Sequence, residues 1–156
     1  MSETLTGLLR ALAGSFAGTV GFAMLVHVPK KSWLPCGLIA ALSYLVYWLL
    51  TQVAGLPDAI GIFAGSLFGS VIGQITARKL KTIATVFLMA AVVPVVPGLG
   101  LYRMMALLGQ GNMSAGGNQG IAAMITIAMI VLGVSMGSFI DRLVHPVRPE
   151  ARGKTD

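Results

Sequence analysis

The sequence Val92-Val93-Pro94-Val95-Val96-Pro97-Gly98 interrupts an apolar run that is long enough to cross a lipid bilayer. Each proline lacks a backbone N–H, and its ring crowds the carbonyl four residues earlier, so the carbonyls of Ala90 and Val93 lose their helical partners. In hydrocarbon, freed backbone groups are tolerated where protein or a water-filled cavity covers them, and transporters bind substrates and ions at such breaks. We therefore expect a broken membrane helix at Pro94 to Gly98.

The composition is that of an integral membrane protein. Of 156 residues, 56% are hydrophobic and 10% are charged, against about 25% charged in a soluble domain. The net charge is +6, but the basic residues lie at the ends of apolar runs, which argues against nucleic-acid binding. The single cysteine, Cys36, forms no internal disulfide, and with His27 and His145 it makes no conventional metal site. No cofactor is expected.

Apolar run lengths predict an all-α fold, a polytopic membrane helical bundle, because about 20 apolar residues cross a 30 Å hydrocarbon core. We expect a single transmembrane domain over residues 1–141 and a polar cytoplasmic tail over 142–156. The first apolar run lacks a basic head and a cleavage site, so we expect it to be retained. The five predicted transmembrane helices, of which the fourth is broken, cover residues 5–27, 34–54, 58–77, 82–101 and 119–140. Only the glycine-rich connection 109–118 is expected to be long.

The distribution of basic residues predicts the orientation. Five spans place the two termini on opposite sides of the membrane. One side has only Arg10 and Arg103, whereas the other collects nine of the 11 basic residues: Lys30, Lys31, Arg78, Lys79, Lys81, Arg142, Arg148, Arg152 and Lys154. The positive-inside rule then places the amino terminus outside and the carboxyl terminus in the cytoplasm.

Small residues predict where the helices pack. Four glycines recur every four residues on one face of the third span: Gly61, Gly65, Gly69 and Gly73. Small residues let membrane helices approach closely, so this face is assigned to helix packing, with the smooth wall of a permeation path as the alternative. Further contacts are predicted at Gly14, Gly18, Gly21, Gly133 and Gly137. Five small helices enclose little volume, so we expect a partner chain or self-association.

The break also predicts where a substrate binds. After Gly98 the chain can begin a short helix, whose free amides and positive dipole end favour an anion such as a carboxylate. Tyr102 can donate a hydrogen bond, and Arg103 can attract the anion or instead extend to the outer headgroups. The predicted substrate-binding residues are Pro94, Pro97, Gly98, Tyr102 and Arg103. The alternative for the two prolines is a kink that only shapes the bundle.

Few ionisable groups remain for other chemistry. Asp58, at the outer start of the third span, is a candidate proton-coupling group, with a helix cap as the alternative. The spans contain no carboxylate pair and no His beside a Ser, so the sequence does not predict an enzyme.

Two motifs resemble the threonine/serine exporter family. The first is Gly21-Phe22-Ala23-Met24 followed by Val28-Pro29, and the second is Ala90-Ala91-Val92-Val93-Pro94-Val95-Val96-Pro97-Gly98 with Tyr102 four residues later. The chain is most similar to the family's short integral-membrane subunit, which pairs with a larger chain in two-component bacterial succinate exporters. The resemblance covers almost the whole chain. The family's motif residues that the resemblance transfers to this chain are Gly21, Pro29, Pro94, Pro97, Gly98 and Tyr102.

The resemblance implies a subunit of an exporter in the bacterial plasma (inner) membrane, driven by the proton motive force. Its substrates would be small carboxylates or hydroxy amino acids, of the succinate or threonine/serine class. A larger membrane subunit would carry the other half of the transporter, because single-chain members have a polar amino-terminal region and a first membrane half that are absent here. The alternative is a homo-oligomeric small membrane channel or scaffold, packed through its glycine stripes within the lipid bilayer.

Overall fold

The computed structural model describes residues 2–93, 96 and 98–144, and every regular element within them is helical. Pro94 and Pro97 therefore lie outside the described residues. This architecture confirms the predicted all-α fold class. The elements are α1 (Ser2–Leu25), the 3-10 turn η1 (Lys30–Ser32), α2 (Trp33–Trp48), the π-helical η2 (Leu49–Val53), α3 (Asp58–Lys79), α4 (Ala84–Val92), α5 (Gly98–Gly109) and α6 (Met113–Val144).

Four described segments are long and apolar enough to cross a membrane: Thr6–Leu25, Lys30–Val53, Asp58–Lys79 and Met113–Val144. They correspond to the first, second, third and fifth predicted spans. The fourth predicted span is divided between α4, with 9 residues, and α5, with 12 residues. At a rise of about 1.5 Å per residue neither helix alone crosses a core of about 30 Å. The break is confirmed, and the count of five spans stays a prediction.

The glycine-rich connection is shorter than predicted. Helix α6 begins at Met113, so most of the expected loop 109–118 is helical. The glycines permit this because α5 packs closely over them: a Cβ atom at Gly116 would lie 2.7 Å from Leu108 Cδ2, and one at Gly120 would lie 2.8 Å from Met104 Sδ. The chain reverses through Gly111, whose φ of +78° favours glycine.

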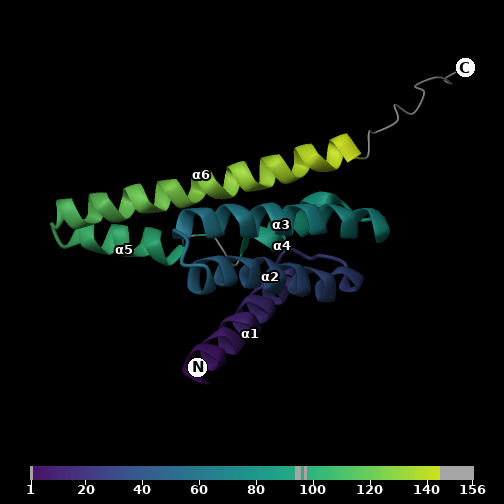
Figure 1. Cartoon of the computed structure of the whole chain (residues 1–156), viewed down its shortest axis with the longest axis horizontal. Helices are drawn as coiled ribbons and strands as arrows, with labels where there is room; N and C mark the ends of the chain where they lie inside the picture. The colour runs from purple at the N-terminus through teal and green to yellow at the C-terminus, as the bar shows by residue number, and fades with distance from the viewer. Residues whose placement is uncertain (1, 94–95, 97, 145–156) are drawn as a thin grey trace, which may run out of the picture.

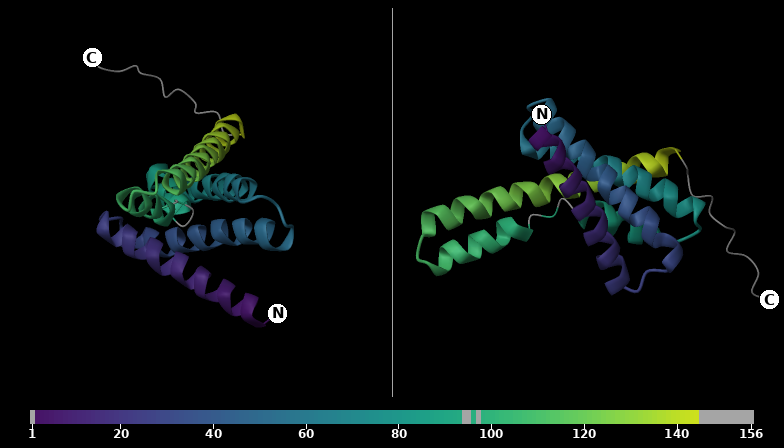
Figure 2. Two further views of the ribbon diagram at one scale, coloured as in Figure 1. Left: turned by 90° about the vertical axis from the view of Figure 1, so that its left-hand side faces the viewer. Right: turned by 90° about the horizontal axis from the view of Figure 1, so that it is seen from below.

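Helix α3 lies at the centre of the molecule and packs against α2, α4 and α6. Figure 1 shows α6 on one side of α3 and α2 on the other, with α1 crossing the outer side of α2. Helix α5 runs antiparallel beside the first part of α6, and this hairpin projects away from the other helices (Figure 2). Among the described elements, α6 is the one large neighbour of α5.

The glycine face of α3 meets α2 and α4. A Cβ atom at Gly65 would lie 2.9 Å from the carbonyl oxygen of Ser43 in α2, and one at Gly73 would lie 3.3 Å from Phe87 Cβ in α4. The opposite face of α3 receives Gly133 of α6, where a Cβ atom would lie 2.7 Å from the Phe63 carbonyl oxygen. Close backbone approach therefore holds the centre of the bundle together.

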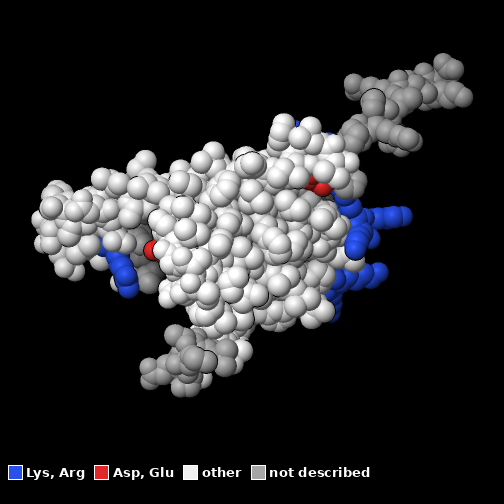
Figure 3. All heavy atoms as spheres, in the orientation of Figure 1, with Lys and Arg blue, Asp and Glu red and all other residues white. Residues whose placement is uncertain are grey.

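Basic side chains gather at one end of the molecule (Figure 3). The elements that end or turn there are η1, which carries Lys30 and Lys31, and the carboxyl ends of α3 and α6, which carry Arg78, Lys79 and Arg142. These described basic residues were all predicted to lie on the same side of the membrane. The assignment of that end to the cytoplasm stays a prediction.

Candidate functional site

The break between α4 and α5 occurs where three other helices meet. The Val96 amide donates to the Val92 carbonyl at 3.1 Å, and the Gly98 amide donates to the Val96 carbonyl at 2.8 Å. Val92 packs against the buried pair Ile62 of α3 and Ile130 of α6, as does Tyr47 of α2. The packed end of α4 therefore anchors the broken helix within the bundle.

The described substrate candidates all lie on α5, beyond the break. Gly98 begins the helix, and Tyr102 is 69% exposed. Arg103 is exposed as well. The first amides of a helix have no acceptor four residues earlier, although the Gly98 amide already donates to the Val96 carbonyl. Helix α5, which carries these residues, packs mainly on α6.

Asp58 is not part of that wall. It is exposed in the first turn of α3, where Pro57 occupies the N-cap position, and its Oδ1 accepts a hydrogen bond from the Tyr47 hydroxyl at 3.4 Å. Helix α5 makes no extensive contact with α3. The structure joins Asp58 to α2, and no hydrogen bond or ion pair among the described residues links Asp58 to Tyr102 or Arg103.

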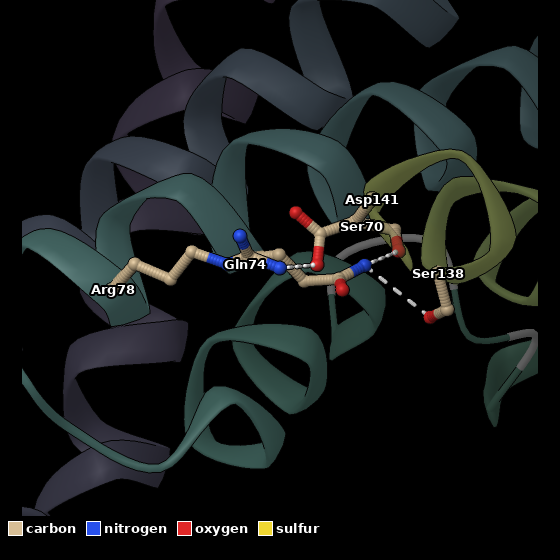
Figure 4. Close-up of polar contacts among 5 residues, drawn as sticks. All are labelled: Ser70, Gln74, Arg78, Ser138 and Asp141. Carbon is tan, nitrogen blue, oxygen red and sulfur yellow. Dashed lines mark hydrogen bonds and ion pairs between the residues drawn. The ribbon is translucent and has the colours of Figure 1, made fainter. Parts of the chain in front are cut away.

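A column of polar side chains between α3 and α6 was not predicted from the sequence (Figure 4). The Ser70 hydroxyl donates to the Val134 carbonyl at 3.2 Å, and Gln74 Nε2 donates to Ser70 Oγ and Ser138 Oγ, each at 3.3 Å. One helical turn further along α3, Arg78 forms an ion pair with Asp141 of α6. The column therefore joins the two helices, with Ser70 and Gln74 buried between them.

One signal for this column was present in the sequence. Ser70, Gln74 and Arg78 are spaced by four residues, which places them on one face of a helix. A glutamine inside an apolar span is costly without a partner and normally faces the bundle interior. The partner of Gln74 on α6 depends on how the two helices are aligned, which residue spacing within one helix does not reveal.

The described residues contain no cluster of three His, Cys, Asp or Glu suited to a metal ion.

The family model described as "Threonine/Serine exporter, ThrE" matches residues 11–140 of the chain. The chain belongs to this family. As a member of the threonine/serine exporter family with several apolar helices, it is a membrane transport component and a multi-pass membrane protein. The match confirms the resemblance inferred from the two motifs, and a transporter family accords with the expectation that the chain is no enzyme.

One relative of this exporter-family chain is an uncharacterized protein of Haemophilus influenzae. The two are 28% identical over 86 residues, which make up 55% of this chain and 29% of the relative. The chain therefore matches less than a third of the relative's length, and the relative is the longer protein. No solved structure matches the chain.

Proposed function

We propose that this chain is one half of an exporter of small carboxylates or hydroxy amino acids, of the succinate or threonine/serine class. A larger membrane subunit completes it in the bacterial plasma (inner) membrane. The observation that carries the proposal is the position of α5, which follows the break and has α6 as its one large neighbour among the described helices. A substrate path along α5 needs a second wall, and a partner subunit can supply it.

The chemistry of α5 suits a carboxylate. Gly98 and Tyr102 are four residues apart and share a helical face, and Arg103 follows at the next position. Amides of the first turn after Gly98, a phenol hydroxyl and a guanidinium can all donate hydrogen bonds to an anion. Both substrate classes carry a carboxylate, so these residues would hold the group that the substrates share.

The outer face of α1 supports docking of a partner. Phe16 and Val20 of α1 pack over Gly37 of α2, whereas Gly14, Gly18 and Gly21 lie on the other side of α1, where nothing lies within 4 Å of an added Cβ atom. Small residues on a membrane helix allow the backbone of another helix to approach closely. This face of α1 would therefore contact the larger subunit.

The basic end of the molecule supports a proposed orientation, and the orientation suggests a role for Asp58. If Lys30, Lys31 and Arg78 face the cytoplasm, the amino terminus lies outside, and so does Asp58 at the other end of α3. Asp58 would then take up protons from the outer side while its carboxylate contacts Tyr47. Asp58→Asn would abolish the dependence of efflux on the proton gradient without loss of the protein from the membrane.

The test is efflux of labelled succinate and labelled threonine from cells that produce this chain together with the proposed larger membrane subunit. Substitution of both Pro94 and Pro97 by alanine restores two backbone donors, and we expect it to remove most of the efflux at an unchanged membrane level. Pro57→Ala, at the N-cap of α3, is the matched control and should transport normally. Unchanged efflux in the double variant would contradict the proposal.

The alternative, a homo-oligomeric channel or scaffold, rests on the same open glycine face of α1, which fits a second copy as well as a different partner. Affinity purification in mild detergent separates the two functions. Recovery of a larger membrane subunit in fixed ratio supports the exporter, whereas a ring of this chain alone that conducts ions in planar bilayers supports the channel.

A further inference from the structure

A cavity of about 300 Å³ lies among α1, α2 and α4. Its floor is formed by residues that are at most 3% exposed: Thr19, Ala23, Cys36 and Ala90. Its rim includes Phe22, Val26 and Met89, which are 38%, 56% and 57% exposed. A buried floor with an exposed rim means that the cavity opens laterally between α1 and α4. Its volume falls at the lower end of the range of small-molecule sites.

The lining does not suit the substrates of an exporter. No described residue that lines the cavity is charged, and the surface is almost wholly apolar. A carboxylate placed there would lose its hydration without gaining a partner. Apolar cavities of this kind also stay free of water. An apolar chain fits this surface, and acyl chains surround a membrane protein on all sides.

Basic residues lie close in the sequence to residues that line the cavity. Lys30 and Lys31 follow the lining residue Val28 by two and three positions, and Lys81 precedes the lining residue Thr85 by four. All three lysines are exposed, and basic side chains gather at one end of the molecule (Figure 3). Basic pockets between membrane helices recognise anionic lipid headgroups, because the phosphate satisfies the ammonium groups at the membrane surface.

We propose that the cavity between α1, α2 and α4 binds one acyl chain of an anionic phospholipid, whose headgroup phosphate contacts Lys30, Lys31 and Lys81. The apolar cavity provides the contact area, and the lysines select the headgroup. None of the described residues that line this cavity belongs to α5, which carries the proposed substrate-binding residues. Bound lipid would fill the space between α1 and α4, which make little direct contact with each other.

The Thr19 hydroxyl provides an internal control. Thr19 is fully buried on the cavity floor, and its Oγ1 has no hydrogen-bond partner within the described part of the chain. Thr19→Val keeps the shape of the floor and replaces an unpaired hydroxyl by a methyl group. Since an acyl chain gains nothing from that hydroxyl, this variant should bind lipid as well as the natural protein or better.

The experiment is native mass spectrometry of the full chain in mild detergent, titrated with phosphatidylglycerol, cardiolipin or phosphatidylcholine. We expect one anionic lipid to bind, and phosphatidylcholine to bind at least about tenfold more weakly, since each lysine near the headgroup contributes severalfold. Lys30→Gln with Lys31→Gln should weaken anionic lipid binding to a similar degree. Lys79→Gln with Arg142→Gln removes the same charge from α3 and α6 and should leave binding unchanged.

A second pair of variants tests the cavity itself. Ala23→Phe fills the floor and should abolish lipid binding, and Ala23→Ser, which leaves the space open, keeps the experiment informative if the larger side chain prevents folding. Equal affinity for the three lipids, equal loss in the two charge variants, or lipid retained by Ala23→Phe would each overturn the proposal. So would crosslinks from Met89 to a copurified membrane protein in place of lipid.

Discussion

Arg78 of α3 forms an ion pair with Asp141 of α6, joining residues that are 63 positions apart in the sequence. The two partners are not equally buried, because the Arg78 side chain is 40% exposed and the Asp141 side chain is 9% exposed. Loss of either partner therefore has a different consequence for the other.

We expect Arg78→Gln to destabilise the protein more than Asp141→Asn. The first removes a charged hydrogen bond that a nearly buried carboxylate accepts, which costs about 1–3 kcal/mol, whereas the second leaves a guanidinium that water can reach, at a cost of up to about 1 kcal/mol. Thermal unfolding in detergent measures both. The double variant should be no less stable than Arg78→Gln alone, and equal effects of the two single changes would contradict this explanation.

Gly65→Ala should separate α3 from α2. The added methyl group would lie 2.9 Å from the Ser43 carbonyl oxygen, and overpacking of this kind costs about 1–3 kcal/mol. The matched control is Gly18→Ala on α1, where nothing lies within 4 Å; removal of a helical glycine there should leave stability unchanged or raise it by up to about 1 kcal/mol. A similar loss of stability in both variants would refute the packing argument.

Gln74→Leu tests whether the α3–α6 column is structural. Gln74 is 8% exposed and bonded to Ser70 and Ser138. Because hydrogen bonds between membrane helices contribute about 0.6 kcal/mol each, we expect a stability loss near 1 kcal/mol and unchanged efflux. A variant that keeps the stability of the unchanged protein but loses transport would show instead that the substrate passes along the polar column.

His27→Gly should stabilise the end of α1. His27 has a φ of +59°, and the Val28 amide closes the helix on the Ala23 carbonyl at 2.9 Å. A side chain in this left-handed conformation costs about 1–2 kcal/mol, which glycine avoids. The melting temperature should therefore rise. Ser15→Gly, inside the same helix, should lower it by the usual helix penalty of glycine.

Gly14→Leu combined with Gly18→Leu should weaken docking of the larger subunit. Both positions face open space in this chain, so bulk added there leaves the fold intact but keeps another helix at a distance. We expect the double variant to copurify with much less partner and to unfold at the same temperature by itself. Gly117→Leu on α6, which is also open, is the control. Undiminished copurification would place the partner elsewhere.

Much of the fold could be predicted from local sequence. Apolar runs bounded by polar residues give α1, α2 and α3 within a few positions, and the prolines with Gly98 give the break. Helix before the predicted span 119–140 was not expected, because a run of glycines ordinarily indicates a loop. Gly116 and Gly120 are helical here because Leu108 and Met104 cover them. Contacts of this kind cannot be predicted from the neighbouring sequence.

Less of the candidate site could be predicted. The sequence places Gly98, Tyr102 and Arg103 in one short helix, as the structure does, but it does not reveal that α5 packs mainly on α6. The contact of Asp58 with Tyr47 and the bonds of Gln74 depend on how helices are aligned with one another. Residue spacing indicates which side chains share a face of one helix, not what that face meets.

The isolation of α5 has a genetic consequence. Since α6 is its one large neighbour among the described helices, a damaging substitution at Met104 or Leu108 has few places within this chain from which repair can come. Suppressor mutations selected for recovered growth should fall into two groups, one on the first turns of α6 and one in the gene for the companion polypeptide. The second group would map, residue by residue, the surface that closes over α5.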